Sequence, residues 1–263
     1  MYDFAYQKPG SLADAVGVLT GDPDAKALAG GQTFIPVLKQ RLNKPTTVVD
    51  LAKLGLSGIT VSGNAITIGA MTRHCDVAAH PDIRAKIPGL ADLASWIGDE
   101  AVRHRGTIGG SLANNDPAAC YPCAVLALGA TVKTDKRSIK ADDYFQGLFT
   151  TALAQGELIT AVEFPIPERS AYEKFRNPAS RYAIVGVFVA KFPDGVRLAI
   201  TGAGQNGVFR HAAMEKALSA NFSPDALNGI TTPAGDMNSD IHASAEYRAH
   251  LCGVIAKRAV AKA

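Results

Sequence analysis

Two short segments contain adjacent glycines whose backbone could hold an anion: Ala29–Thr33 and Thr107–Ser111. Each segment adjoins an apolar run and is followed by residues that can begin a helix or a turn. Because glycine has no Cβ, its peptide groups can approach a ligand closely and can adopt positive φ. Their N–H groups can then converge on an anion, as in phosphate-binding loops and at helix N-termini. Two such segments in one chain indicate a phosphate group held from two sides.

The second glycine segment leads into a polar cluster, Asn114, Asn115 and Asp116. Amide and carboxylate side chains of this kind can cap backbone groups or bind ribose hydroxyls. The alternative is that they cap only their own turn, which Asn and Asp do often. The residues alone leave both roles open.

A third glycine segment, Gly202–Gly207, matches the dinucleotide-binding pattern G-x-G-x-x-G after a predicted strand. That fold needs a helix directly after the motif and an acidic residue about 20 positions further on. The helix predicted here comes only after Arg210 and leads into loop-rich sequence, and Asn206-Gly207 is a common tight-turn pair. We therefore predict a turn at this segment and no dinucleotide site.

Cys120 and Cys123 form a C-x-x-C pair, whereas Cys75 and Cys252 stand alone. A redox pair or half of a zinc site is conceivable, but no second ligand pair follows at a suitable spacing. Free cysteine usually behaves as a small buried apolar residue, so we interpret these as structural. We expect no metal site, and no constellation of catalytic side chains stands out.

The composition describes a globular protein of 263 residues, with 47% hydrophobic and 19% charged residues. The net charge of +3 is small and the basic residues are scattered, which argues against nucleic-acid binding. The N-terminus lacks the pattern of a secretion signal, and the longest apolar run, Tyr182–Ala190, is far shorter than the ~20 residues of a membrane helix. We expect a cytoplasmic protein without a transmembrane segment.

The first glycine segment lies in a predicted strand–helix–strand unit. Ser11–Asp14 has the pattern of a capping box that begins a helix. A strand is predicted at residues 25–29, a helix after Thr33 and a second strand at residues 47–51. The double glycine is thus placed at a strand-to-helix turn.

The rest of the chain is predicted to contain mixed helices and strands, with a domain boundary at Pro165–Ser170. A hairpin is expected about Gly63-Asn64. The other expected elements are a mostly helical stretch at 72–96, strands at 130–133, 158–164, 182–191 and 196–201, and helices at 212–218 and 246–260.

Segments Ala29–Lys39 and Gly106–Ala118 resemble the first and second flavin-binding motifs of the FAD subunits of molybdenum hydroxylases. This family includes the medium subunit of aerobic carbon monoxide dehydrogenase and the FAD domain of xanthine dehydrogenase. The resemblance continues through Tyr172–Lys174 and Arg181–Gly186 and ends at Glu246–Arg248, so it covers nearly the whole chain. The order and separation of the two glycine motifs make it specific.

The resemblance implies an α+β protein with two domains. Residues 1–168 would form an FAD-binding region of the vanillyl-alcohol-oxidase-like type, with subdomains at about 1–54 and 55–168 and the cofactor between them. Residues 169–263 would form a small C-terminal α+β domain of the carbon monoxide dehydrogenase flavoprotein type, with an antiparallel sheet and helices.

The resemblance also implies a set of cofactor ligands. Lys174 and either Ile159 or Leu158 would lie near the isoalloxazine, and Gly98 would approach the cofactor through its backbone. Many relatives carry Asp where this chain has Cys120, and a thiol cannot accept hydrogen bonds as a carboxylate does, which leaves that contact open. The pyrophosphate and the remaining cofactor contacts would fall to Ala29, Gly30, Gly31, Gln32, Thr33, Thr107, Ile108, Gly109, Gly110, Ser111, Asn115 and Asp116.

In function, the chain is similar to an oxidoreductase subunit that holds FAD non-covalently. Its implied partners are a large molybdopterin subunit and a small subunit with two [2Fe–2S] clusters, in a dimer of heterotrimers. Such a subunit passes electrons from the clusters to an external acceptor. Two alternatives remain: a stand-alone flavin-dependent oxidoreductase and a flavin-free assembly partner.

Overall fold

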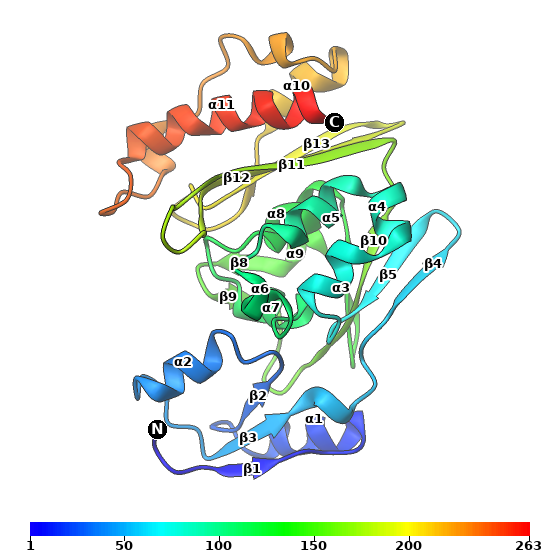
Figure 1. Cartoon of the computed structure of the whole chain (residues 1–263), viewed down its shortest axis with the longest axis vertical. Helices are drawn as coiled ribbons and strands as arrows, with labels where there is room; N and C mark the ends of the chain where they lie inside the picture. The colour runs from blue at the N-terminus through cyan, green and yellow to red at the C-terminus, as the bar shows by residue number, and fades with distance from the viewer.

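The computed structural model describes residues 1–263 and shows three layers stacked along the long axis of the molecule (Figure 1). The first layer is a parallel sheet of three short strands, in the order β1-β3-β2. Ser11 accepts a hydrogen bond from the Asp14 N–H and so caps the helix that crosses from β1 to β2, as its capping pattern predicts. The elements of this layer are β1 (Ala5–Gln7), α1 (Leu12–Gly21), β2 (Lys26–Leu28), α2 (Phe34–Lys39) and β3 (Thr47–Asp50).

The middle layer combines a five-stranded antiparallel sheet with most of the helices (Figure 1). Its strand order is β4-β5-β10-β6-β7, so the last strand of the layer in sequence lies at the centre of the sheet. The elements are β4 (Ile59–Ser62), β5 (Ala65–Gly69), α3 (His74–Ala79), α4 (Pro81–Lys86), α5 (Pro88–Ser95), α6 (Glu100–Arg103), α7 (Ile108–Asn114), α8 (Tyr121–Ala127), β6 (Thr131–Thr134), β7 (Ser138–Lys140), α9 (Ala141–Tyr144), β8 (Phe145–Gly147), β9 (Thr150–Thr151) and β10 (Ile159–Pro165).

The third layer is a four-stranded antiparallel sheet with two helices over its outer face (Figure 1). The strands are β11 (Arg169–Arg176), β12 (Ala183–Phe192), β13 (Gly195–Thr201) and β14 (Phe209–Arg210). Helices α10 (Ala212–Ala220) and α11 (Ala245–Lys262) pack on this sheet from outside, and α5 and α8 pack on it from the middle layer.

The third-layer sheet has two buried faces, and each face belongs to a different hydrophobic core. Tyr172 and Phe188 join the large core of the middle layer. Val187 and Val189, whose side chains alternate with Phe188 along β12, join the core beneath α10 and α11. The predicted boundary at Pro165–Ser170 thus lies between two sheets, while one core crosses it.

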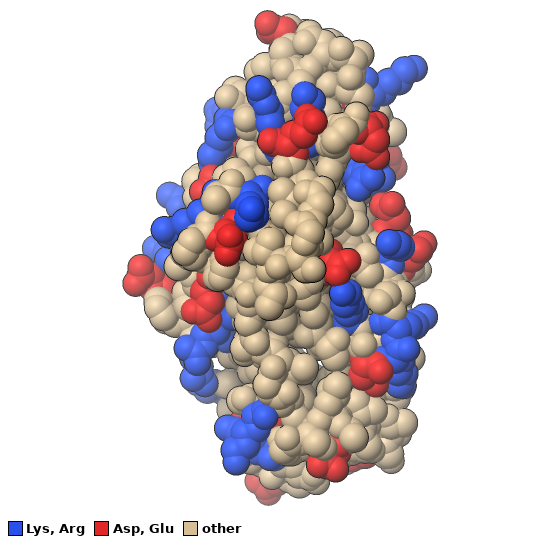
Figure 2. Space-filling view, turned by 90° about the vertical axis from the view of Figure 1, so that its right-hand side faces the viewer, with Lys and Arg blue, Asp and Glu red and all other residues tan.

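The structure confirms the mixed helix-and-sheet class and most of the predicted elements. The hairpin about Gly63-Asn64 is present, and the predicted helical stretch at 72–96 is divided into α3, α4 and α5. Several short elements were not predicted, and neither were strand β11 and the helical conformation of Gly109 and Gly110 inside α7. No helix is both long enough and apolar enough to cross a bilayer. Figure 2 shows charged residues of both signs interspersed on the face that it draws.

Candidate functional site

A cavity of about 580 Å³ lies between the layers and contains almost all of the residues expected to bind the cofactor. Its lining comes from all three layers: the segment before α2, the α6–α8 region and the strand β11 with the loop after it. Among the predicted ligands, only Ile108 and Asn115 do not line it. The predicted residues that do are Ala29, Gly30, Gly31, Gln32, Thr33, Gly98, Thr107, Gly109, Gly110, Ser111, Asp116, Cys120, Ile159 and Lys174.

The first glycine segment presents unused hydrogen-bond donors. None of the backbone N–H groups from Gly30 to Thr33 donates to a backbone or side-chain acceptor of the protein. Gly31 has a φ of +73°, which reverses the chain just before α2 and is a conformation that favours glycine. Consecutive free N–H groups at a reversal of this kind form an anion-binding concavity.

Gly30 also brings the two glycine segments together. A Cβ at this position would lie 2.2 Å from the carbonyl oxygen of Arg105 and 2.7 Å from the Cα of Gly106. Only a residue without a side chain allows this approach. The first segment therefore packs directly against the backbone that leads into the second.

The second glycine segment differs from expectation, because its N–H groups are used within the protein. The Ile108 and Gly109 N–H groups donate to the carbonyl oxygens of Thr72 and Ala70, at 3.1 and 2.8 Å. The Gly110 N–H donates to the Thr107 hydroxyl, which caps α7, at 3.2 Å. A Cβ on Gly109 would lie 2.8 Å from the Ala70 oxygen. This segment thus forms a closely packed wall of the cavity rather than a second set of free donors.

Two predicted ligands have structural roles. Ile108 is fully buried in the core. Asn115 ends α7 in the left-handed conformation, and its amide donates to the carbonyl oxygens of Gly147 and Thr150, both at 2.8 Å. The side chain of Asn115 therefore holds the β8–β9 hairpin, while its neighbour Asp116 lines the cavity.

Lys174 reaches the cavity from β11 and is only 6% exposed. Its ammonium donates to the carbonyl oxygens of Trp96 and Arg181, at 2.8 and 2.9 Å, and to the Cys120 sulfur at 3.4 Å. These three bonds use all the hydrogens of the ammonium and hold it in one place. The structure thus holds the ammonium of Lys174 in a fixed position in the lining of the cavity.

Gly98 lines the same cavity as this lysine and lies in a bend that favours glycine. Its φ is +51°, and its carbonyl accepts hydrogen bonds from Arg103 and Arg181 at 3.3 and 3.4 Å. Ile159, at the start of β10, adds an apolar surface to the same cavity.

His74 and Tyr182 are among the further residues that line the cavity and were not predicted as cofactor ligands. His74 lies against Gly106, where a Cβ would come within 2.6 Å of its Nε2, and its Nδ1 has no partner. Burial, with a smaller effect of Arg103, lowers the pKa of His74 to about 4, so the ring is neutral at pH 7. Tyr182, half-exposed, precedes β12. Neither residue belongs to a glycine motif, although Tyr182 lies in the segment Arg181–Gly186 that carries the resemblance.

The C-x-x-C pair does not form a disulfide, and all four cysteines are free. The Cys123 thiol donates to the Cys120 carbonyl oxygen at 3.0 Å and is buried in the core. Cys252 is also buried, which fits a structural role for both. Cys120 differs from them because it lines the cavity.

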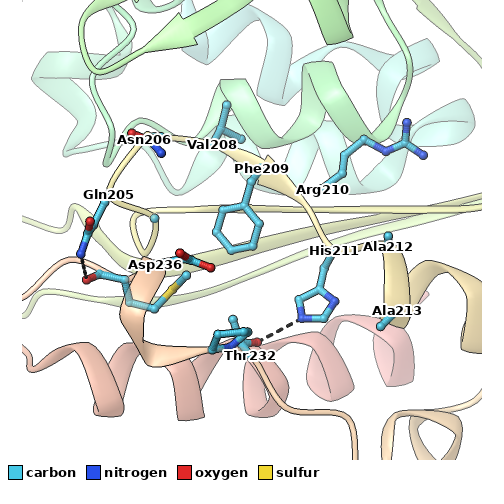
Figure 3. Close-up of a pocket in the computed structure, with 14 residues that line it drawn as sticks. Gln205, Asn206, Val208, Phe209, Arg210, His211, Ala212, Ala213, Thr232 and Asp236 are labelled. Atoms are coloured by element: carbon cyan, nitrogen blue, oxygen red, sulfur yellow. Dashed lines mark hydrogen bonds between the residues drawn. The ribbon is translucent and has the colours of Figure 1, made fainter.

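The third glycine segment lies beside a separate hollow of about 340 Å³ on the C-terminal layer (Figure 3). The chain after Gly207 forms β14, antiparallel to β13, instead of the helix that a dinucleotide fold requires. In Figure 3, His211 points toward the Thr232 hydroxyl, and their hydrogen bond is 3.2 Å long. The prediction of a turn without a dinucleotide fold is confirmed.

The fold encloses a cavity between its layers, and the free N–H groups of Gly30–Thr33 in its lining suit a phosphate-containing cofactor. The chain matches the model of the FAD binding domain in molybdopterin dehydrogenase over residues 2–167. It belongs to this family. The resemblance in the two glycine motifs is thereby confirmed, the cofactor is FAD and the chain is an oxidoreductase component.

Full-length relatives support this assignment. The chain is 35% identical to the carbon monoxide dehydrogenase medium chain of Afipia carboxidovorans, over 99% of this chain and 96% of that one. It is 33% identical to the glyceraldehyde dehydrogenase medium chain of Sulfolobus acidocaldarius, over 98% of this chain and 97% of that one. The similarity therefore extends well beyond the FAD-binding domain.

Solved structures show the same fold. The chain superposes on the cyanide-inactivated form of Cu,Mo-CO dehydrogenase with a TM-score of 0.90 and 34% identity, covering 100% of this chain and 98% of that one. It superposes on quinoline 2-oxidoreductase from Pseudomonas putida 86 with a TM-score of 0.88 and 30% identity, covering 99% of this chain and 96% of that one.

Proposed function

We propose that this chain is the FAD-carrying electron-transfer subunit of a heteromeric molybdenum hydroxylase. The subunit would accept electrons from [2Fe–2S] clusters of a partner and deliver them to an external acceptor. The observation that carries the proposal is the cavity between the layers, where the free N–H groups of Gly30–Thr33 and the fixed ammonium of Lys174 line one space. Relatives across the full length of the chain are named medium chains or subunits, which supports a multi-subunit assembly.

The residues of the cavity fit FAD. The N–H groups of Gly30–Thr33 would bind the pyrophosphate, with Gly109 and Gly110 allowing it to approach the wall of α7. Asp116 would accept from hydroxyl groups of the cofactor. Bound FAD supplies the chemistry of electron acceptance and release, while the protein supplies orientation and electrostatics.

At the other part of the lining, Lys174, Ile159 and Gly98 would surround the isoalloxazine. The ammonium of Lys174 is only 6% exposed, so its charge would be weakly screened and would favour negative charge added to the ring. Ile159 would exclude water from one side. Binding would be non-covalent.

We further propose the finer architecture and assembly implied by the family. Residues 1–168 would be a two-subdomain region of the vanillyl-alcohol-oxidase-like type, divided near residue 54, and residues 169–263 a C-terminal domain of the carbon monoxide dehydrogenase flavoprotein type. The partners would be a molybdopterin subunit and an iron–sulfur subunit, in a dimer of heterotrimers. Four free cysteines support a reducing, cytoplasmic setting.

Affinity purification at native expression tests this proposal. We expect a yellow preparation whose absorption spectrum shows flavin and whose mass analysis shows two further subunits. The isolated chain should be yellow and reducible by dithionite, yet inert toward purines, aldehydes and N-heteroaromatic compounds. Addition of the two partner subunits should restore substrate-dependent reduction.

Two results would contradict the proposal. Steady substrate oxidation by the molybdenum-free chain alone would favour a stand-alone flavoenzyme. A colourless chain that still assembles with its partners would favour a flavin-free assembly role.

A further inference from the structure

We infer that His74 is a positioning residue for the cofactor: its buried ring holds Gly106 in place, and Gly106 holds the backbone of Gly30, where the anion-binding N–H groups begin. The three residues belong to separate segments of the chain, at the start of α3, before α7 and before α2. All three line the cavity. The effect on FAD rests on the proposed function, whereas the contacts within the chain do not.

The backbones of Gly30 and Gly106 are in direct contact. A Cβ on Gly30 would lie 2.7 Å from the Gly106 Cα, closer than the 3.0 Å to which real Cβ atoms approach other atoms. The N–H groups of Gly30–Thr33, which have no acceptor in the protein, begin at this contact. A displacement of Gly106 should therefore move these donors.

His74 contacts Gly106 through both its backbone and its ring. The His74 N–H donates to the Gly106 carbonyl oxygen at 3.0 Å, and the Gly106 N–H donates to the Val102 carbonyl oxygen at 2.7 Å. A Cβ on Gly106 would lie 2.6 Å from Nε2 and 2.8 Å from Cδ2 of His74. Gly106 is thus held by hydrogen bonds at its N–H and its carbonyl, and by the edge of the imidazole ring.

The ring of His74 is itself held by the core of the middle layer. The side chain is buried, and the fully buried ring of Tyr121 lies beside it, with 5.3 Å between ring centroids. Close packing of this kind keeps a side chain in one conformation. The position of the imidazole edge, and with it that of Gly106, is therefore determined by the core.

Histidine is a costly choice for core packing alone. Its Nδ1 is buried and has no hydrogen-bond partner, which lowers stability relative to an apolar side chain of the same shape. Imidazole is, however, the smallest aromatic ring among the side chains. It fits edge-on against Gly106, where a six-membered ring would need more room. A requirement at Gly106 accounts for histidine better than the stability of the core does.

The full chain stripped of flavin allows a test with three added ligands. FAD and ADP both contain a pyrophosphate, whereas riboflavin contains none. We expect His74→Ala to weaken the binding of FAD and of ADP about 10-fold each, as for the loss of about one hydrogen bond to a charged group. The affinity for riboflavin should change less than about 2-fold. Unchanged FAD affinity, or an equal loss for all three ligands, would overturn the inference.

His211→Ala is the matched control. His211 is also a buried histidine, but it lies on the C-terminal layer and bonds to Thr232, outside the flavin cavity (Figure 3). Its replacement should lower stability and leave the affinities for FAD and ADP unchanged. An equal weakening of FAD binding in His74→Ala and His211→Ala would show that loss of any buried histidine has this effect, and would overturn the inference.

Gly106→Ala tests the contact between the ring and the glycine. On its own this substitution places a Cβ 2.6 Å from the His74 Nε2 and should weaken FAD binding at least about 10-fold. In His74→Ala the ring is absent and the same Cβ has room, so adding Gly106→Ala should weaken binding less than about 3-fold further. Independent effects of the two substitutions would overturn the inference, because residues in contact are expected to couple.

The amide resonances of Gly30–Thr33 in the flavin-free chain provide a test that needs no cofactor. His74→Ala, or His74→Gln if the alanine variant does not fold, should shift these resonances, and His211→Ala should not. Unchanged resonances in a folded His74 variant would overturn the inference. A chain that shows these shifts but never binds FAD contradicts the proposed function alone. A chain that binds FAD equally well with and without His74 contradicts only the inference.

Discussion

The two glycine segments look alike in sequence and do different things in the structure. Gly30–Thr33 has no regular secondary structure, and its N–H groups have no acceptor in the protein. Gly109 and Gly110 lie in the first turn of α7, and their N–H groups donate to Ala70 and Thr107. The first segment can bind an anion through its donors, whereas the second makes room for one by lacking side chains. A glycine pair therefore does not specify which of these roles it performs.

This difference predicts that substitutions in the first segment reduce FAD binding more than substitutions elsewhere. Gly30→Val places a Cβ 2.2 Å from the Arg105 oxygen, so the segments must separate. We expect loss of bound FAD together with a loss of about 3 kcal/mol in unfolding free energy. Flavin absorbance and urea denaturation measure these effects. Gly17→Ala in α1, where a Cβ meets nothing within 4 Å, is the control and should leave stability unchanged or slightly raised. Retention of stoichiometric FAD by Gly30→Val would contradict the close approach of the two segments.

The imidazole ring of His74 packs against Gly106, directly before the second glycine segment, and should make the stability of the protein depend on pH. The pKa of His74, about 4, lies below the 6.5 of an unfolded histidine, so the unfolded chain takes up a proton first as the pH falls. Stability should be fully present above pH 6.5 and should decline by about 2–3 kcal/mol toward pH 4.

Urea denaturation at several pH values checks this prediction. His74→Gln should flatten the decline, and replacement of the exposed His104 should leave it unchanged. An equally steep decline in His74→Gln would show that other groups cause it.

Gly110→Val tests whether the wall of α7 must be free of side chains. Its Cβ would meet the Thr107 hydroxyl at 2.9 Å, a side-chain contact that can adjust, so the fold should survive with a cost of about 1 kcal/mol. We expect flavin to be lost because the added methyl groups project toward the cavity. Circular dichroism and the ratio of flavin to protein are the measurements, and full flavin content in Gly110→Val would remove Gly110 from the site.

Substitution in the third glycine segment should not change the amount of FAD that the protein binds. In Gly204→Ala the Cβ would lie 2.7 Å from the Gly207 oxygen, which costs about 1–2 kcal/mol in stability. The folded fraction should hold as much FAD as wild type. Flavin loss in well-folded Gly204→Ala would reopen a cofactor role for this segment.

Local features of the fold were predictable from the sequence, whereas features that depend on distant partners were not. The cap of α1 and the hairpin about Gly63-Asn64 depend on residues a few positions apart, and both were predicted correctly. Strand β11 was missed because its sequence, with charged residues among the apolar ones, forms a strand only through its pairing with β12.

The same distinction applies to the site. The sequence predicted which segments line the cavity, because the glycine motifs are contiguous. The sequence could not predict that the carbonyl oxygens of Ala70 and Thr72 accept hydrogen bonds from the N–H groups of α7. Nor could it predict the hydrogen bond between Lys174 and Cys120, since these contacts join positions far apart in the chain. The structural role of Asn115 was hidden for the same reason, because its partners are in the β8–β9 hairpin.

The sheet that carries Lys174 is shared by two cores, and this has a consequence for how the protein melts. Tyr172 and Phe188 on one face belong to the middle layer, and Val187 and Val189 on the other belong to the layer of α10 and α11. Separation of the chain near residue 168 would expose one of these faces to water. The two parts should therefore lose their structure in a single calorimetric transition, with the sheet acting as a common interior wall instead of a hinge.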